Sequence, residues 1–441
     1  MDMTTHIDRT HGAALASWVE SAHGHAQFPI QNLPMGVFAT GASARIGCAI
    51  GDQVLDVAAA LSAGLLPDVD TRTARAVTGE TLNAWMALDA AQRRTLRVDL
   101  SRLLEAGSHT GAIAQRHRGV ILHAQEDCRM LLPAQVGDYT DYYAGIHHAY
   151  NCGVIFRPEQ PLQPNYKHLP VAYHGRASTL MPSGVPVHRP SGQVRVDGDG
   201  GPQGRFQPTA RLDYELELAI WVGPGNPLAT RIDIAQAAQH VAGFGLLNDW
   251  SARDIQAWES APLGPFLGKN FMTSVSPWVV TSDAMAPFRA ARMPRDASDP
   301  RPLAYLDDAD DAACGGLSIA LEVHLSTRRM REAGLAPHRL SHGDASALWW
   351  TPAQMVAHHT AGGCNLRPGD LIGTGTISMP EGRECGCLLE MTHGGKRPVQ
   401  LPNGEVRSFL EDGDEVVLRG TCRREGFASI GFGECRGQVR G

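Results

Sequence analysis

The chain has 441 residues and a formal net charge of −7, from 39 basic and 46 acidic side chains. Its composition, 43% hydrophobic and 19% charged, is typical of a globular protein with a large core; it shows no basic patch for nucleic acid and no apolar run long enough to span a membrane. The 48 glycines and 28 prolines favour a turn-rich, mainly β protein with some helices.

Residues 1–25 are polar and rich in histidine and glycine, which predicts a flexible N-terminal arm. Short apolar runs up to residue 57 are typical of strands, and two of them flank Gly51 and Asp52 as in a β-hairpin. The following text, to about residue 125, favours helices, because alanine, leucine and arginine dominate it. We therefore expect a small barrel-like β unit with helices over residues 26–122 and a larger unit over residues 123–441.

The segment 137–148 combines acids, tyrosines and two histidines where a loop is expected to lead into a helix. Asp141 and His148 are its candidate functional groups. An isolated histidine is more often a packing or helix-capping residue than a catalytic one, so this segment alone leaves both interpretations open.

A strand is predicted over residues 212–220, where apolar and acidic residues alternate. Glu215 and Glu217 then project to the same side, roughly 7 Å apart along the backbone. Two carboxylates this close repel unless a positive group lies between them, and a hard cation such as Mg²⁺ or Ca²⁺ would serve. Taken alone, the pattern favours a solvated acidic face over a metal site.

The segment 248–258 is predicted to be a helix that places Asp249, Arg253 and Gln256 on one face. The group is either a surface ion pair or part of a cleft between packed tryptophans. The sequence of this segment alone does not separate the two.

Lys269 lies in an apolar segment rich in glycine and proline. There it either stabilises a developing oxyanion or extends its ammonium into solvent. Further along, a glycine-rich turn over residues 373–378 could bring Thr376 close to a ligand. The turn lacks the Gly-Lys-Ser/Thr ending of a phosphate-binding loop.

Three other segments complete the pattern of the larger unit. Two loops, 189–209 and 294–314, are expected to be poorly structured surface insertions. Leu388–Met391 carries a strand pattern, in which Glu390 is a carboxylate that needs a partner.

The nine cysteines are scattered and form no C-x-x-C pair, which favours reduced thiols in the cytosol over a disulfide framework. Cys385 and Cys387 could ligate a soft metal, but no partner motif accompanies them. The first residues contain no apolar signal segment. We therefore expect a cytoplasmic protein that neither binds nucleic acid nor enters a membrane.

Several of these segments occur together and in order: DYTDYYAGIHH, LPVAYHGRAS, LDYELELA, VGPGNP, NDWSARDIQAWE, PLGPFLGKNF, GCNLRPGDLIGTGTIS and FLEDGDEV. FPIQNLPMGVF and the hairpin IGDQVLDV extend the set toward the N-terminus. Together they resemble the fumarylacetoacetate hydrolase family over roughly residues 27–437. The ordered set is far more specific than any one motif.

The resemblance implies an N-terminal SH3-like β-barrel domain, a larger C-terminal mixed β-sandwich roll and a homodimer. It also implies metal-dependent hydrolysis of the carbon–carbon bond of 4-fumarylacetoacetate, a small diketo acid, to fumarate and acetoacetate. In this family that reaction is the last step of tyrosine, phenylalanine or homogentisate breakdown.

The resemblance also assigns residues to roles. It implies Ca²⁺ or Mg²⁺, or both, as cofactor, with the metal site formed by Asp141, Glu215, Glu217, Asp249, Lys269 and Thr273. His148 is implied as general base and Glu390 as its orienting partner, and negative charge is implied to be held by Arg253, Gln256 and Lys269. The substrate-contacting positions are implied to be Tyr143, Arg157, Tyr173, Arg253, Gln256 and Thr376.

The chain departs from the family in two places. Ser260 stands where many relatives have a tyrosine, and the text of residues 379–386 differs from the usual sequence. Both differences leave the substrate range open. The alternatives are a hydrolase of another acylpyruvate or β-diketone, an oxo-acid decarboxylase of the same superfamily, and a non-catalytic protein stabilised by metal. The combination of His148, Glu390 and the N-terminal unit favours fumarylacetoacetate.

Overall fold

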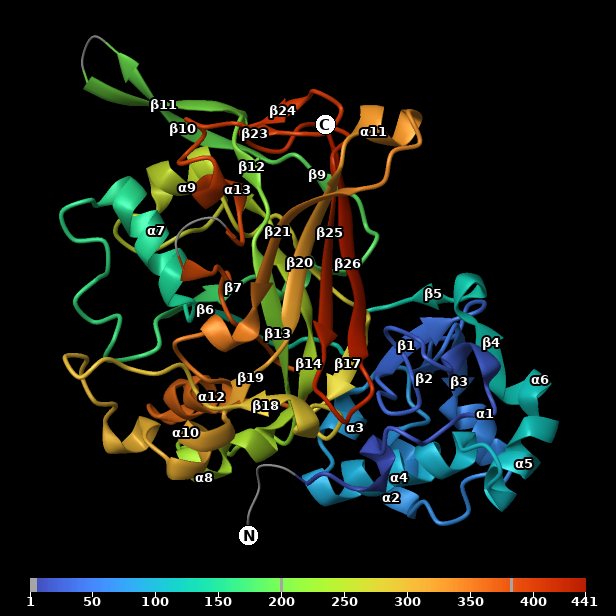
Figure 1. Cartoon of the computed structure of the whole chain (residues 1–441). Helices are drawn as coiled ribbons and strands as arrows, with labels where there is room; N and C mark the ends of the chain where they lie inside the picture. Colours follow the sequence, from blue (N-terminus) through green and yellow to red (C-terminus); the bar gives the residue numbers. More distant parts are fainter. Residues whose placement is uncertain (1–5, 199–200, 381–383) are drawn as a thin grey trace.

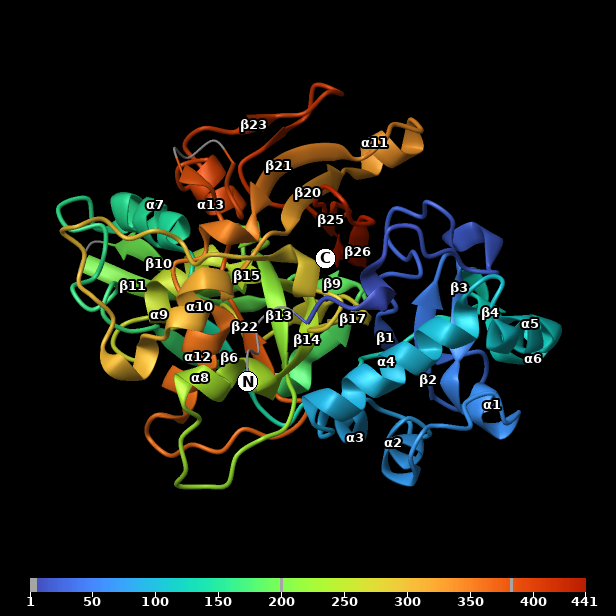
Figure 2. The ribbon, with the colours of Figure 1, turned by 60° about the horizontal axis from the view of Figure 1, so that its bottom comes forward.

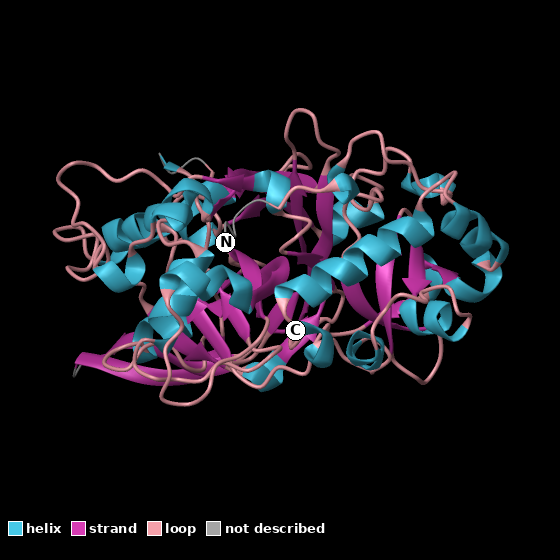
Figure 3. Ribbon diagram, turned by 90° about the horizontal axis from the view of Figure 1, so that it is seen from below, coloured by secondary structure: helices cyan, strands magenta, loops and turns pink. Residues whose placement is uncertain are grey.

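The computed structural model describes residues 6–198, 201–380 and 384–441. Figure 1 shows the N-terminal part, in blue, beside a larger body of sheets and short helices. Strands run through the middle of the molecule and the helices lie mainly around them (Figure 3). The expected mainly β architecture with some helices is confirmed.

In its described residues, the N-terminal part contains five strands and six α-helices. The strands are β1 (Met35–Ala39), β2 (Arg45–Ile50), β3 (Gln53–Asp56), β4 (Leu122–Ala124) and β5 (Arg129–Met130). The helices are α1 (Val57–Ser62), α2 (Thr71–Ala76), α3 (Asn83–Met86), α4 (Ala90–Leu104), α5 (His109–Arg116) and α6 (Arg118–Ile121). Strands β2 and β3 form the predicted hairpin, and Gly51 at its turn has a positive φ of 57° that glycine adopts without strain.

The main sheet extends from these N-terminal strands into the larger body. Its further strands are β6 (Tyr139–Tyr142), β7 (Ala172–Gly175), β8 (Leu180–Pro182), β13 (Leu216–Val222), β14 (Val241–Asp249), β16 (Thr273–Val275), β17 (Trp278–Thr281) and β22 (Leu371–Gly373). The strand order is β4-β3-β2-β1-β17-β14-β13-β22-β6-β7, with β1 pairing antiparallel to β17. Among the described residues, the strand pairings make β1–β4 a continuation of the main sheet. Figure 2 shows the two parts side by side.

A second sheet packs against the main one. Its order is β21-β20-β25-β26-β9, and its strands are β9 (Val187–His188), β20 (Ala320–Ser326), β21 (His338–Asp344), β25 (Glu415–Cys422) and β26 (Ile430–Arg440). Buried side chains from both sheets, among them Leu246, Leu418 and Phe432, belong to one hydrophobic cluster. This core supports β13 and β14, which carry acidic site residues.

Short helices and two-stranded ribbons surround the sheets. The helices are α7 (Ile146–Phe156), α8 (Ile234–Ala237), α9 (Arg253–Glu259), α10 (Ala309–Cys314), α11 (Arg328–Glu332), α12 (Pro352–Thr360) and α13 (Leu388–Met391). The ribbons pair β10 (Ser191–Gly198) with β11 (Gly201–Pro208), β12 (Leu212–Asp213) with β15 (Ser251–Ala252), β18 (Arg289–Ala290) with β19 (Gly316–Leu317), and β23 (Val399–Gln400) with β24 (Val406–Arg407).

The single strand predicted over residues 212–220 is wrong, because the extended segment is broken at Tyr214 and Glu215. The backbone N–H of Tyr214 donates to the side-chain carboxylate of the preceding residue, Asp213, at 2.9 Å. The backbone N–H of Glu215 donates to the side-chain oxygen of Asn248 at 3.0 Å. Side-chain acceptors therefore replace the strand-to-strand backbone hydrogen bonds at these two residues, and Glu215 lies between β12 and β13.

Two further element predictions are wrong. The segment 248–258 is helical only from Arg253 onward, because Asp249 is the last residue of β14 and pairs with Thr273 of β16. Residues 388–391 form helix α13 instead of a strand. The carboxylate of Asp213 accepts the backbone N–H groups of Leu388 and Leu389 and so satisfies donors that a helix start leaves open.

The two predicted surface insertions contain regular structure. Residues 191–198 and 201–208 form the β10–β11 hairpin, where Val194 packs on Ile255. Residues 309–314 form α10, which the Asp308 side chain caps by accepting the N–H of Asp311. Of the divergent segment 379–386, residues 381–383 lie outside the described part of the chain.

Candidate active site

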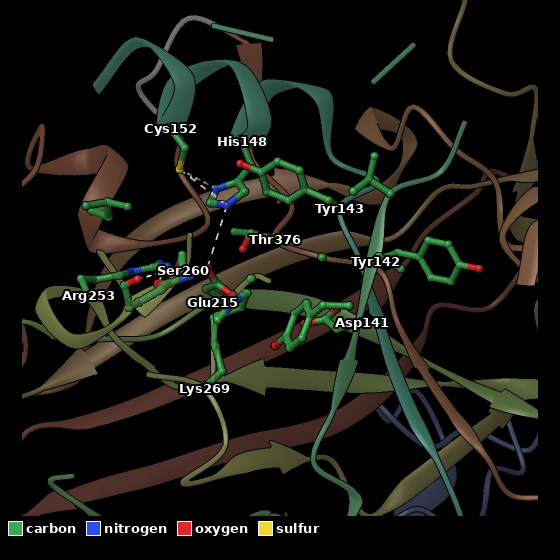
Figure 4. A pocket seen from close by; sticks show the side chains of 18 of the residues that line it. Asp141, Tyr142, Tyr143, His148, Cys152, Glu215, Arg253, Ser260, Lys269 and Thr376 are labelled. Atoms are coloured by element: carbon green, nitrogen blue, oxygen red, sulfur yellow. Dashed lines mark hydrogen bonds and ion pairs between the residues drawn. The ribbon is translucent and has the colours of Figure 1, made fainter. Parts of the chain in front are cut away.

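A cavity of about 580 Å³ opens where β6, α7, β13 and α9 meet (Figure 4). Most of the site residues predicted from the sequence line it, namely Asp141, Tyr143, His148, Arg157, Tyr173, Glu215, Glu217, Arg253, Gln256, Lys269 and Thr376. The other three predicted residues do not line the cavity. Asp249 bonds Lys269 and Glu390 bonds His148, both of which line it, and Thr273 bonds Asp249. The fold therefore gathers all the predicted residues in one region.

Three buried carboxylates form the floor of this region. Asp141 of β6, Glu217 of β13 and Asp249 of β14 each offer an oxygen within 4.8 Å of the others. The strand order β14-β13-β22-β6 brings them together, with Gly373 of β22 opposite Asp141. A β-carbon on Gly373 would lie 2.5 Å from the Asp141 carboxylate and 3.0 Å from that of Glu217, so any larger residue here would force the Asp141 carboxylate to shift.

The three acids fit a divalent cation. Burial and the neighbouring carboxylates raise the pKa values of Asp141 and Glu217 well above their ordinary range. Within the described residues, Asp141 Oδ1 and Glu217 Oε1 are buried without a hydrogen-bond partner. Buried acidic oxygens that repel one another and lack donors are the ligand set that Mg²⁺ or Ca²⁺ prefers.

Asp249 is held from several sides. Its Oδ1 accepts the hydroxyl of Thr273 at 2.8 Å, and its Oδ2 accepts the hydroxyl of Tyr173 at 2.6 Å and the ammonium of Lys269 at 2.8 Å. Lys269 also donates to Glu215. The negatively charged partners outweigh burial and raise the pKa of Lys269 above its ordinary value, so the ammonium form is maintained.

Glu215 differs from the other acids in having cationic neighbours. Its carboxylate bonds Lys269 and accepts Arg253 Nη1 at 2.7 Å. Burial alone would raise its pKa, but Lys269, Arg253 and His148 outweigh burial and lower the pKa to about 2. Glu215 thus stays ionised between the acidic cluster and His148, whose Nε2 lies 3.9 Å away.

His148 and Glu390 form a buried pair. Glu390 Oε1 lies 2.6 Å from His148 Nδ1, and Asn151 Nδ2 and Ser378 Oγ donate to the same carboxylate at 2.8 Å each. Burial lowers the pKa of His148, but Cys152 and Glu390 outweigh burial and raise it well above the ordinary value. The Nδ1 contact leaves Nε2 on the side of Glu215 (Figure 4).

The remaining wall is suited to an acidic organic molecule. The ring of Tyr143 meets the His148 ring edge-on at 5.3 Å between centroids. Among the described residues, the hydroxyl of Thr376 is buried and has no partner. Arg157 is exposed and Ser260 lines the cavity.

Sequence reasoning missed several supporting residues. Asp213 bonds Arg253 Nε at 2.9 Å and caps α13, so it positions both Arg253 and Glu390. Asn151 could have been found, because it lies three residues after His148 on the expected helix and so on the same side. Gly373 offers no local signal, since its role depends on the strand opposite.

Comparisons with known proteins match nearly the whole chain. Residues 31–133 match the family model described as Fumarylacetoacetase N-terminal, and residues 139–440 match Fumarylacetoacetate (FAA) hydrolase C-terminal. A fumarylacetoacetase of Oryza sativa subsp. japonica is 45% identical, covering 96% of this chain and 97% of its own. The fumarylacetoacetase of Arabidopsis thaliana is 44% identical, covering 97% of this chain and 99% of its own. That of Homo sapiens is 43% identical, covering 94% of this chain and 96% of its own. The chain belongs to the fumarylacetoacetate hydrolase family.

Proposed function

We propose that the protein is a fumarylacetoacetase, which hydrolyses a carbon–carbon bond of 4-fumarylacetoacetate to give fumarate and acetoacetate. This reaction ends the breakdown of tyrosine. Relatives named fumarylacetoacetase match nearly the whole chain. The observation that carries the proposal is the buried His148–Glu390 pair beside three clustered carboxylates.

The residues that would hold the cation are Asp141, Glu217 and Asp249, with Glu215 beside them. Mg²⁺ or Ca²⁺ bound there supplies a Lewis acid that polarises the substrate's oxygens. Thr273, Tyr173 and Lys269 hold the Asp249 carboxylate in place by donating to its two oxygens. The protein's own part is to keep these oxygens in place and to leave Asp141 Oδ1 and Glu217 Oε1 without a hydrogen-bond donor among the described residues.

His148 is the general base in this proposal. With Nδ1 held by Glu390, the neutral form of His148 accepts a proton at Nε2 from a water molecule, which then attacks the carbonyl carbon on the fumaryl side. The C–C bond to the acetoacetate half breaks, and the departing enolate takes a proton at carbon. No G-x-S-x-G nucleophile motif occurs in the sequence, which supports water as the nucleophile.

The tetrahedral intermediate carries negative charge that needs donors. Arg253 Nη2 is buried and, among the described residues, has no hydrogen-bond partner, so it can donate to the alkoxide. Gln256 and Lys269 line the same cavity. Loss of one such donor typically costs about 3–4 kcal/mol of transition-state stabilisation.

Tyr143, Tyr173 and Thr376 contact the substrate in this proposal, and Arg157 pairs with a terminal carboxylate at the open end of the cavity. Ser260 is a small side chain on the cavity wall. A small residue there leaves room for other diketo acids, which makes the related acylpyruvates the second candidate substrates.

The proposal extends to a cytoplasmic homodimer that binds neither nucleic acid nor membrane. Among the described residues, no helix is long and apolar enough to cross a bilayer. Leu263 is 96% exposed and Phe266 is 66% exposed, which supports an apolar contact with a second copy. Light scattering of the purified protein decides between monomer and dimer.

The test is a side-by-side assay of the cation-loaded protein with fumarylacetoacetate, maleylacetoacetate and acylpyruvates. We expect fumarylacetoacetate to disappear fastest and to give fumarate and acetoacetate in equal amounts. Faster turnover of an acylpyruvate would transfer the assignment to that substrate class. Separate titrations with Mg²⁺ and Ca²⁺ identify the cation.

A further inference from the structure

Two thiols lie beside the His148–Glu390 pair, and the hydrolytic mechanism uses neither. Cys152 Sγ is 3.7 Å from both ring nitrogens of His148. Cys387 Sγ is 3.2 Å from Glu390 Oε1 and 4.0 Å from His148 Nδ1. All four residues are buried.

Two short helices present these groups in pairs. Cys152 follows His148 by four residues on α7, so both side chains lie on the same face. Cys387 is the N-cap residue of α13 and precedes Glu390 by three residues. Cys152 and Cys387 also belong to one buried cluster, so the two pairs face each other.

Four of the six separations among the ligand atoms are close to those of a tetrahedral metal site. With bonds of about 2.0–2.3 Å to zinc, neighbouring ligand atoms lie roughly 3.3–3.8 Å apart. The corresponding separations here are 2.6, 3.2, 3.7 and 4.0 Å. His148, Cys387 and Glu390 already offer atoms within 4.8 Å of one another.

The donor types separate this cluster from the carboxylate cage. Asp141, Glu217 and Asp249 offer only oxygen, which suits Mg²⁺ or Ca²⁺. Two thiols and an imidazole instead select softer ions such as Zn²⁺. An ion can reach them, because His148 and Cys152 both line the cavity (Figure 4).

We propose that His148, Cys152, Cys387 and Glu390 form a second metal site for a thiophilic divalent ion such as Zn²⁺, and that an ion there stops hydrolysis. The inhibition half rests on the proposed role of His148 as general base. An ion on Nδ1 displaces Glu390 from that nitrogen and leaves the single ring proton on Nε2. Nε2 then cannot accept a proton from water.

The binding test uses Co²⁺ as a coloured probe, added to the reduced protein in saturating Mg²⁺. We expect a thiolate-to-cobalt charge-transfer band that saturates at one equivalent and disappears when Zn²⁺ is added. The band is expected to be lost in Cys152→Val/Cys387→Ser and kept in Cys364→Ser, which removes an exposed thiol that does not line the cavity. No band in the wild type, or an unchanged band in the double variant, overturns the site.

The activity test compares Zn²⁺ inhibition in each protein with that protein's own Zn²⁺-free rate. The inhibitory concentration should rise more than about 100-fold in the double variant, because even outer partners of a metal ligand are worth 10- to 100-fold in affinity. Cys364→Ser should be inhibited like the wild type. Equal inhibition of the double variant refutes the inhibitory role.

The two tests keep separate failures apart. A protein that hydrolyses nothing yet shows the cysteine-dependent band retains the metal site and loses the proposed function. A cysteine-dependent cobalt band without Zn²⁺ inhibition of hydrolysis keeps the metal site but refutes the proposal that the bound ion blocks His148. Should the double variant fail to fold, Cys152→Ser carries the same comparison alone, and a band and an inhibitory concentration equal to the wild type's would then overturn the proposal.

Discussion

At the scale of single residues, neighbours decide how each buried acid behaves. Glu215 and Glu217 are two positions apart and equally buried, yet their pKa values move in opposite directions. Lys269 and Arg253 stabilise the charge on Glu215, while Asp141 repels the charge on Glu217. The cluster therefore lacks positive charge on the Glu217 side, where we place the cation.

Replacement of Glu217 tests that placement. Glu217→Gln should be more stable than the wild type without cation, because it removes one of several repelling carboxylates. The wild type should gain about 2.7 kcal/mol at a cation concentration 100 times its Kd, and the variant should gain far less at that concentration. Thermal unfolding with and without Mg²⁺ or Ca²⁺ measures both effects. An equal gain in the two proteins would contradict the cage.

Replacement of His148 tests the general base. His148→Gln should lower kcat by about 100- to 10,000-fold, the usual contribution of a positioned base. Cation affinity, measured by calorimetry, should stay close to that of the wild type. His147→Gln is the matched control, because His147 is the adjacent residue on α7 and does not line the cavity. Turnover within tenfold of the wild type in His148→Gln would remove the assignment.

At the scale of elements, the site is built where strands and short helices end. The sequence predicted the Gly51 hairpin and the helical stretch after it, because these depend on local turn chemistry and composition. It mispredicted residues 388–391, because Leu-Leu fits a buried strand or a helix equally well. The outcome depends on Asp213, which is 175 residues away and caps α13.

The candidate site residues were predicted by the ordered motifs, although three of the element predictions that carried them were wrong. Asp249 ends a strand and Arg253 begins a helix, so the two residues do not share one helix face. The paired contacts of Arg253 with Asp213 and Glu215 could not be read from spacing. Such contacts depend on packing between distant segments.

Gly373 tests how β22 supports the carboxylates. In Gly373→Ala the added methyl group meets the Asp141 carboxylate, so the acids must move apart and cation affinity should fall by about 10- to 100-fold, as for other outer partners of metal ligands. Gly343→Ala on β21 is the control, because its β-carbon meets only ordinary contacts at 3.5 Å or more. Calorimetric titration with Mg²⁺ measures the difference. Unchanged affinity in Gly373→Ala would contradict the account of this strand.

At the scale of the whole molecule, the N-terminal part and the larger body share structure. Strand β1 pairs with β17, and one buried cluster contains Leu33 and Trp85 together with Trp221 and Val279. Separation of the parts would expose this apolar surface to water. The domain bounds 26–122 and 123–441 remain a prediction from the sequence, and the shared core couples the two parts.

The coupling predicts a single thermal unfolding transition for the whole chain. Gly36→Ala should lower stability by about 1–3 kcal/mol, because its β-carbon would lie 2.6 Å from the Trp278 ring at the β1–β17 junction. Gly41→Ala is the control, since no atom lies within 4 Å of its β-carbon. Scanning calorimetry measures the transition. Two separate transitions in the wild type, or equal stability of the two variants, would contradict the coupling.

The most direct test of the central claim follows the oxygen of water through the reaction. The cation-loaded protein is given 4-fumarylacetoacetate in ¹⁸O-enriched water, and the products are examined by mass spectrometry. The account predicts equal amounts of fumarate and acetoacetate, with one ¹⁸O in the new carboxylate of fumarate, and formation of both products slowed by about 100-fold or more in His148→Gln. Unconsumed substrate, or fumarate formed without the label, would contradict it.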